Sequence, residues 1–132
     1  MTYEVSMLDH VAIGVRDMSA SLKFYDEVFR VLGIRRLITY GGTDDLPDHV
    51  GYGSGEKPDF WVGANTPVQG YVHICLAARS RADVEAFHAA ALNAGAADNG
   101  SPGLRPEYHP GYYGAFVIDL NGCNLEAVHH TF

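Results

Sequence analysis

The feature that most constrains the fold of this 132-residue chain is an order of elements that recurs with a constant offset. A strand-like segment contains His10, and a second such segment contains His73, 63 positions later. The helix-like segments that follow them contain Phe24 and Phe87, which are also 63 positions apart. Because strand, helix and offset recur together, the sequence predicts a duplicated module.

In the first module, residues 8–15 are rich in β-branched side chains and predict a strand. Residues 17–32 carry apolar side chains at steps of three and four, which predicts an amphipathic helix. Asp17 or Ser19 can cap its start, and Gly33 can end it. Shorter strands are predicted at residues 35–40, near 50–52 and at 60–62, with glycines and prolines marking the turns.

The second module repeats this order. Residues 71–77 predict a strand, residues 81–94 a helix that ends at Gly95, and residues 115–118 and 124–128 the clearest later strands. A weaker strand is expected within 97–106, and the segment 99–114, rich in Gly, Pro and Tyr, is expected to be a loop entering a strand. The predicted fold class is therefore α+β, with two βαβββ modules that form curved mixed sheets with helices on the outside. We expect one domain over residues 1–132, with module one at about 5–65 and module two at about 69–130.

Charge and composition limit the classes of partner. The formal net charge is −7, from 9 Lys and Arg against 16 Asp and Glu, so nucleic acid is not an expected partner. No apolar run approaches the roughly 20 residues of a membrane helix, and the first residues lack a secretory signal, so no membrane partner and a cytoplasmic location are expected. Cys75 and Cys123 lack metal-site or disulfide spacing and are expected to be reduced thiols of the core.

Two histidines and one glutamate stand at repeated positions on predicted strands. Side chains alternate across a strand, so each of His10, His73 and Glu126 lies opposite the aliphatic face that packs on a helix. Two imidazoles and a carboxylate suit one divalent metal ion (zinc, nickel, iron, manganese or cobalt) and leave positions open for substrate. The alternatives are that both histidines are satisfied core residues, that Glu126 pairs with a surface cation, and that no metal is bound.

The runs LDHVAIGVRDMSASLKFY (8–25) and AFVIDLNGCNLE (115–126) resemble the vicinal-oxygen-chelate superfamily of glyoxalases, bleomycin-resistance proteins and extradiol dioxygenases. The second run is similar to that family's pattern F-x-x-D-P-x-G-N-x-x-E, with Leu120 in place of Pro and Cys123 in place of Asn. The resemblance implies the glyoxalase/bleomycin resistance/dioxygenase fold, with metal ligands on the first, fifth and eighth strands, here His10, His73 and Glu126. It also implies a homodimer, sometimes with modules exchanged, in which the metal ligands can come from two chains.

The same resemblance bears on the type of activity. Glyoxalase I has a fourth ligand, a carboxylate on the fourth strand, and residues 60–63 contain none, although Glu56 and Asp59 lie just before them. The three-ligand set resembles extradiol dioxygenases and fosfomycin-resistance thiol transferases instead. Dioxygenases usually carry two such double modules, and this chain has one.

Several further residues are candidates for the site. The aromatic and basic side chains of the segment 99–114 can form a substrate wall, or else a rigid turn or a dimer contact; they are Arg105, Tyr108, His109, Tyr112 and Tyr113. Besides Glu126, Tyr113 or His109 can act as an acid or base if it lies near the metal. Trp61 either lines the substrate cup or belongs to the core. His49 and His88 are expected on the surface, and His129 and His130 at a solvated end.

Two functions are therefore predicted as alternatives. The first is a metal-dependent enzyme, of lyase or isomerase type, in which the metal acts as a Lewis acid on two neighbouring oxygens of a small molecule. Dioxygenase or thiol-transfer chemistry is the less favoured alternative for such an enzyme. The second is a metal-free protein of bleomycin-resistance type that binds or sequesters a small molecule by aromatic stacking. A third alternative is a decayed site in a domain that serves interactions.

Overall fold

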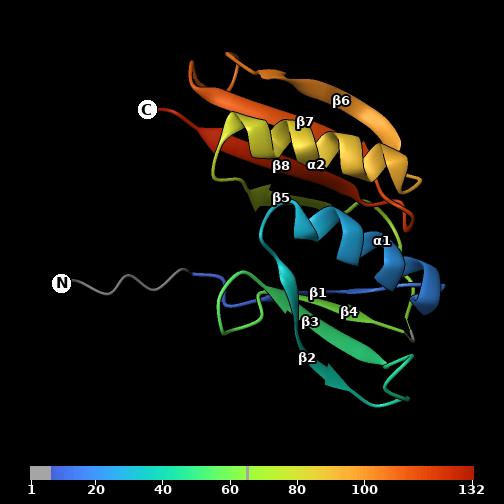
Figure 1. Ribbon diagram of the computed structural model, residues 1–132. Helices are drawn as coiled ribbons and strands as arrows, with labels where there is room; N and C mark the ends of the chain where they lie inside the picture. Colours follow the sequence, from blue (N-terminus) through green and yellow to red (C-terminus); the bar gives the residue numbers. More distant parts are fainter. Residues whose placement is uncertain (1–6, 65) are drawn as a thin grey trace.

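A computed structural model describes residues 7–64 and 66–132, so the expected module boundaries at residues 5 and 65 lie outside the described part. It contains two four-stranded sheets. In each module a helix follows the first strand and precedes the other three, which is the order expected from the repeat (Figure 1). The first module comprises β1 (Val11–Gly14), α1 (Met18–Arg30), β2 (Arg35–Tyr40), β3 (His49–Gly53) and β4 (Phe60–Gly63). The second comprises β5 (His73–Ala77), α2 (Arg81–Asn93), β6 (Ala97–Leu104), β7 (Tyr112–Ile118) and β8 (Asn124–His130).

The two sheets have the same topology. Their strand orders are β1-β4-β3-β2 and β5-β8-β7-β6, and in each the first and last strands of the module pair in parallel. The remaining pairs are antiparallel. The prediction of two βαβββ modules with mixed sheets is thus confirmed, and β1 and β5 become sheet edges.

Helix α1 begins where the sequence indicated. The Asp17 side chain accepts a hydrogen bond from the backbone N–H of Ala20 at 2.9 Å, which satisfies one of the free donors of the first turn. Gly33 follows the last turn with φ of 75°, a conformation that glycine adopts without the steric cost of a side chain. The helix packs on its sheet through aromatic rings, with Phe29 5.1 Å from Tyr52 between ring centroids.

In the second module, α2 starts at Ser80, whose hydroxyl accepts from the Asp83 N–H, and buries Val84 and Phe87 completely. The predicted loop at 99–114 is shorter than expected, because β6 continues to Leu104 and β7 begins at Tyr112. Pro102 is accepted there because β6 is an edge strand with two register shifts against β7.

The helices lie side by side, so the modules share one hydrophobic core (Figure 1). Tyr25 of α1 donates a hydrogen bond of 2.6 Å to Asp119, in the turn between β7 and β8. Asn121 of the same turn donates to Ser21. These contacts connect the modules through a helix of one and a turn of the other.

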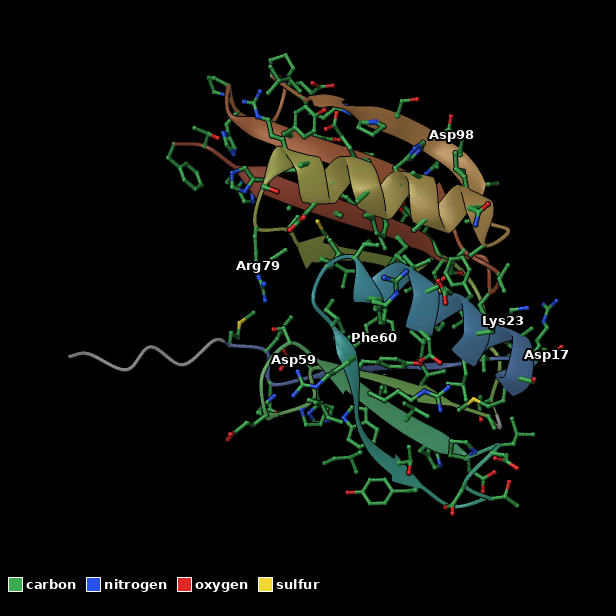
Figure 2. All side chains as sticks on the ribbon, viewed as in Figure 1. Asp17, Lys23, Asp59, Phe60, Arg79 and Asp98 are labelled. Atoms are coloured by element: carbon green, nitrogen blue, oxygen red, sulfur yellow. The ribbon has the colours of Figure 1, made fainter. Side chains whose placement is uncertain are left out.

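A cleft of about 550 Å³ remains between the modules, mostly apolar, with Asp59 and Phe60 on one side and Arg79 on the other (Figure 2). No helix in the described part of the chain is long and apolar enough to cross a membrane.

Two residue-level expectations are wrong. His88 is 8% exposed rather than a surface residue, because its Nε2 bonds Asp98 Oδ1 at 2.9 Å between α2 and β6. Cys75 is exposed rather than a core thiol, because it lies on the face of β5 that no helix covers, whereas Cys123 is buried.

Candidate functional site

Each sheet has a helix-covered face and an open face, set by strand alternation. On β8, Leu125 and Ala127 are fully buried against the helices, so Glu126 points to the open face. On β5, His73 and Cys75 share that face, and Cys75 stands directly opposite Glu126 in the parallel ladder. The open face of the second sheet therefore carries two of the three predicted metal ligands, His73 and Glu126.

A carboxylate, an imidazole and a phenol form the centre of this face. His73 Nε2 lies 2.7 Å from Glu126 Oε1, and Tyr112 donates its hydroxyl proton to Glu126 Oε2. Glu126 is only 1% exposed, whereas the side chain of His73 is 39% exposed. The buried carboxylate thus has two partners, one of which remains open to a ligand.

The site is accessible along β5. His73 and Cys75 both line the cleft between the modules. The surrounding protein, and after it the negative charge of Glu126, raise the pKa of the Cys75 thiol to about 12. Burial and the bond to Glu126 also raise the pKa of Tyr112, so its phenol stays a neutral donor.

The predicted substrate wall is only partly near this centre. Tyr112 takes part, and Tyr108 packs edge-on against it, with ring centroids 4.9 Å apart. Tyr113 points to the helix-covered side instead, where its hydroxyl donates to Glu85 of α2 at 3.1 Å. Strand alternation explains this, since neighbouring residues of β7 face opposite sides.

The other two wall candidates have structural partners. Arg105 donates to the carbonyl oxygens of Ser101 and Gly103 and lies over the Phe116 ring, with its guanidinium carbon 5.4 Å from the ring centroid. His109 pairs with His130 across 2.8 Å between ring nitrogens. Neither side chain contacts His73 or Glu126 through a hydrogen bond.

His10 lies apart from this centre, directly before β1 of the first sheet. Its Nδ1 is 2.7 Å from Asp9 Oδ1, which orients the ring, and within residues 7–64 and 66–132 no hydrogen bond to its Nε2 is formed. Together with Ala12, Tyr40, His49 and Trp61 it lines a shallow pocket of about 290 Å³. Trp61 thus lies on the open face and not in the core.

Within the described residues, no three His, Cys, Asp or Glu side chains come together as a group that could hold a metal ion. The structure brings His73 and Glu126 together and places His10 at the start of β1, in the other module. It also places no carboxylate on β4, whose residues are Phe60–Gly63, and Asp59 is paired with Lys57 at 3.0 Å.

Sequence reasoning missed three residues of these faces. The outward-facing positions of His49 and Tyr40 could not be predicted, because apolar and polar residues do not alternate clearly along their strands, β3 and β2. Asp9 precedes β1, and only its position next to His10 could have signalled a carboxylate partner.

The chain matches one protein family by sequence and several solved structures by fold. The profile of the Glyoxalase/Bleomycin resistance protein/Dioxygenase superfamily matches residues 7–126. A glyoxalase/bleomycin resistance protein from Albidiferax ferrireducens T118 is 28% identical, with a TM-score of 0.75, and the match covers 96% of this chain and 100% of that one.

Two more distant solved structures share the fold. The fosfomycin resistance protein FosX from Listeria monocytogenes, in complex with Mn(II) and 1S,2S-dihydroxypropylphosphonic acid, is 13% identical, with a TM-score of 0.69 over 98% of this chain and 94% of that one. Glyoxalase I from Zea mays is 19% identical, with a TM-score of 0.69 over 95% of this chain and 45% of that one. Among functionally curated proteins, no sequence matches the chain.

Proposed function

The chain belongs to the Glyoxalase/Bleomycin resistance protein/Dioxygenase superfamily, and from that premise we propose that it is a metal-dependent enzyme acting on a small molecule, of lyase or isomerase type. The observation that carries the proposal is the contact of 2.7 Å between His73 Nε2 and Glu126 Oε1 on an open sheet face. One of these groups is a buried carboxylate and the other an imidazole that a ligand can reach.

The His73–Glu126 pair fits two neighbouring positions around a divalent ion. Protein nitrogen and oxygen ligands lie about 2.0–2.2 Å from zinc, so two adjacent ligand atoms are about 3 Å apart. The observed 2.7 Å separation is close to that value. Zinc, nickel, iron, manganese and cobalt are all compatible with a nitrogen and a carboxylate oxygen.

His10 is the proposed third ligand, and a second copy of the chain is the proposed source. Metal-binding histidines commonly direct the other ring nitrogen to a carboxylate, and Asp9 meets His10 Nδ1 in this way. Because one chain holds His10 on the first sheet and His73 with Glu126 on the second, two copies related by a twofold axis can each complete the other's site.

The protein residues have separate tasks in this proposal. A bound divalent ion would supply Lewis-acid stabilisation of negative charge on two neighbouring substrate oxygens. Glu126 is the proposed general base, since its carboxylate is desolvated and held at a fixed position. Tyr112 holds the second carboxylate oxygen and, with its raised pKa, remains a proton donor.

Metal analysis of protein purified without a histidine tag tests the proposal. We expect stoichiometric metal in the wild-type protein and its loss in both His10→Ala and His73→Ala. His130→Ala is the matched control, because His130 is an exposed histidine of β8 whose ring nitrogen pairs with His109 and not with Glu126 in the described part of the chain, and it should retain the metal. Metal-free wild-type protein, or equal metal content in all variants, would contradict the proposal.

A metal-free binding protein is the second candidate, and one observation favours it. The His73 and Tyr112 side chains supply a hydrogen-bond partner to each oxygen of Glu126, so side chains of the protein itself satisfy the buried carboxylate. A protein that binds a small molecule without metal and shows no turnover would support this candidate.

A further inference from the structure

Two histidines that the proposed function does not use as ligands join the turn between β6 and β7 to the end of β8, at the end of the second sheet where the C-terminus lies (Figure 1). His109 belongs to the turn and His130 to the strand, and His109 Nε2 is 2.8 Å from His130 Nδ1. The ring centroids are 5.1 Å apart and the ring planes differ by 18°. Because the two nitrogens are much closer than the centroids, the rings meet edge to edge through one N–H···N hydrogen bond.

A backbone group determines which nitrogen of each ring carries the proton. The N–H of Gly111 donates to His109 Nδ1 at 3.2 Å, so Nδ1 is an acceptor and the proton of the neutral His109 ring is on Nε2. That Nε2–H donates to His130 Nδ1, which leaves the proton of His130 on its own Nε2. The complete arrangement therefore forms only when both imidazoles are neutral.

An added proton breaks this arrangement at either accepting nitrogen. On His109 Nδ1 it faces the N–H of Gly111, and on His130 Nδ1 it faces the N–H of His109, so two donors oppose each other. Protons reach the pair from water, because His130 is exposed. A free imidazole takes up a proton near pH 6.5, at roughly the value of model peptides. Separated rings bind more protons than the joined pair, so the contact is lost as the pH falls.

The surroundings of the pair supply aromatic rings and no compensating charge. Phe132 stacks on both imidazoles, with centroids 5.0 Å from His109 and 5.3 Å from His130. Tyr112 of β7 meets the same two rings edge-on. The titratable residues that the turn and the open face bring to this end of the sheet are Arg105, Glu107, Tyr108, Tyr112 and Glu126. In the part of the chain that the structure describes, none of them forms an ion pair with either imidazole.

The pair controls the position of the turn. Among residues 106–110, His109 alone forms a hydrogen bond with a side chain of β8. Tyr108 of the turn packs on Tyr112, with ring centroids 4.9 Å apart, and the Tyr112 hydroxyl donates to Glu126. How closely the turn is held against β8 therefore sets how closely Tyr108 covers the contact between Tyr112 and Glu126.

We propose that the His109–His130 pair is a proton-operated latch, which holds the turn closed near neutral pH and releases it in acid. Release moves Tyr108 away from Tyr112 and opens the face that carries Glu126 at its β6–β7 end. The latch needs no metal and no ligand, whereas its effect as a regulator of the site rests on the proposed function.

Nuclear magnetic resonance of chelator-treated protein at pH 7.5 and pH 5.5 tests the latch directly. At pH 7.5 we expect both rings as the Nε2–H tautomer and a nuclear Overhauser effect between the His109 and Phe132 rings. At pH 5.5 we expect both rings protonated and this effect at least about threefold weaker. The methyl resonances of Val84, which is completely buried, should stay unchanged and so exclude general unfolding.

Two substitutions of His130 separate the hydrogen bond from ring stacking. His130→Asn offers a carboxamide oxygen as acceptor and does not titrate, so the turn should stay closed at both pH values. His130→Phe keeps a ring for stacking but has no acceptor, so the turn should be open at both. His49→Asn is the matched control, an exposed histidine of the first module, and should keep the pH response of the wild-type protein. A wild-type turn that is closed at pH 5.5, a closed turn in His130→Phe, or opening of His130→Asn equal to that of the wild-type protein would each overturn the proposal.

Metal analysis at pH 7.5 separates this inference from the proposed function. Release of the turn leaves His10, His73 and Glu126 in place, so His130→Phe should keep the metal content of the wild-type protein. If the wild-type protein lacks metal but its turn opens in acid, the metal proposal fails and the latch stands. If metal is bound and the turn stays closed at pH 5.5, the latch fails and the metal proposal stands.

Discussion

At the scale of single residues, the histidines at the first strand of each module, His10 and His73, have different carboxylate partners. His10 meets the exposed carboxylate of Asp9, and His73 meets the buried carboxylate of Glu126. An exposed partner can only orient an imidazole, because water screens its charge. A buried carboxylate on an open face can itself bind a ligand or take a proton, so Glu126 and Asp9 are expected to respond differently to substitution.

Asp9→Asn tests the orienting role. If Asp9 fixes the His10 ring for metal binding, its replacement should weaken metal affinity by about 10- to 100-fold without removing a ligand. Asp59→Asn is the matched control, because Asp59 contacts Lys57, as Asp9 does, but not His10. Competition with a chelator of known affinity measures the difference, and equal affinities of the two variants would exclude the role.

The Cys75 thiol provides a prediction of pH dependence. Its pKa is raised from 9.0 to about 12, so at pH 8 the thiolate is about 10³-fold scarcer than in a free thiol. In chelator-treated protein, iodoacetamide should therefore alkylate Cys75 slowly at pH 8 although the residue is exposed, with a rate that rises tenfold per pH unit until about pH 12.

Glu126→Gln should speed this alkylation by removing the nearby negative charge, but not to the free-thiol rate, because desolvation of the thiol by the surrounding protein is the larger cause of the raised pKa. Cys123→Ser is the background for both proteins, so that a single thiol is followed. Rapid alkylation at pH 8 in the Cys123→Ser protein would show that neither the surrounding protein nor Glu126 raises the pKa of the Cys75 thiol.

At the scale of elements, the joint between the modules is made by α1 and the turn between β7 and β8. Tyr25 is fully buried, and its phenol donates to Asp119, which is 6% exposed. The other oxygen of Asp119 accepts the backbone N–H groups of Asn121 and Cys123. One buried carboxylate, that of Asp119, therefore holds the turn in shape and also connects it to helix α1 of the other module.

Tyr25→Phe should lower the free energy of unfolding by about 1–3 kcal/mol, because it leaves a buried carboxylate oxygen without its donor. Tyr52→Phe is the matched control: that phenol donates to Asp26, which is partly exposed and also held by Arg36, so the loss should be smaller. Urea unfolding at pH 7 measures both variants. A loss for Tyr52→Phe equal to that for Tyr25→Phe would argue against a special role of the joint.

Much of the element order could be predicted because it depends on local patterns. Residues 35–40 were placed without error, and the Asp17 cap is correct, since side-chain spacing and capping act within a few residues. The continuation of β6 to Leu104 could not be predicted, because Gly and Pro indicate a loop and only pairing with β7 shows a strand. The helix-facing position of Tyr113 was missed for the same reason: its face follows from a register that the Tyr-rich segment does not specify.

At the scale of the whole molecule, the repeat predicts two equivalent modules but not how their open faces meet. Within one chain α1 and α2 lie side by side, and the three proposed ligands are divided between two sheets. Their relative positions depend on packing between modules, to which no local sequence pattern corresponds. The pairing of His73 with Glu126 could be predicted, because β5 and β8 belong to one module, whereas the position of His10 could not.

This division leads to a complementation experiment. His10→Ala chains keep an intact His73–Glu126 pair, and His73→Ala chains keep an intact His10. If each site takes its ligands from two copies, neither variant alone should bind metal, but a mixed dimer contains one complete site, formed by His10 of one chain and the pair of the other. Unfolding and refolding the two variants together, followed by metal analysis of the dimer fraction, should therefore recover metal that neither variant shows when refolded alone.

Mixing His10→Ala with the double variant His10→Ala/His73→Ala is the control and should recover none, because no chain in that mixture carries His10. If the variant mixture also stays metal-free while the wild-type protein refolds with metal, both ligand groups act within one chain, and the second copy is not needed.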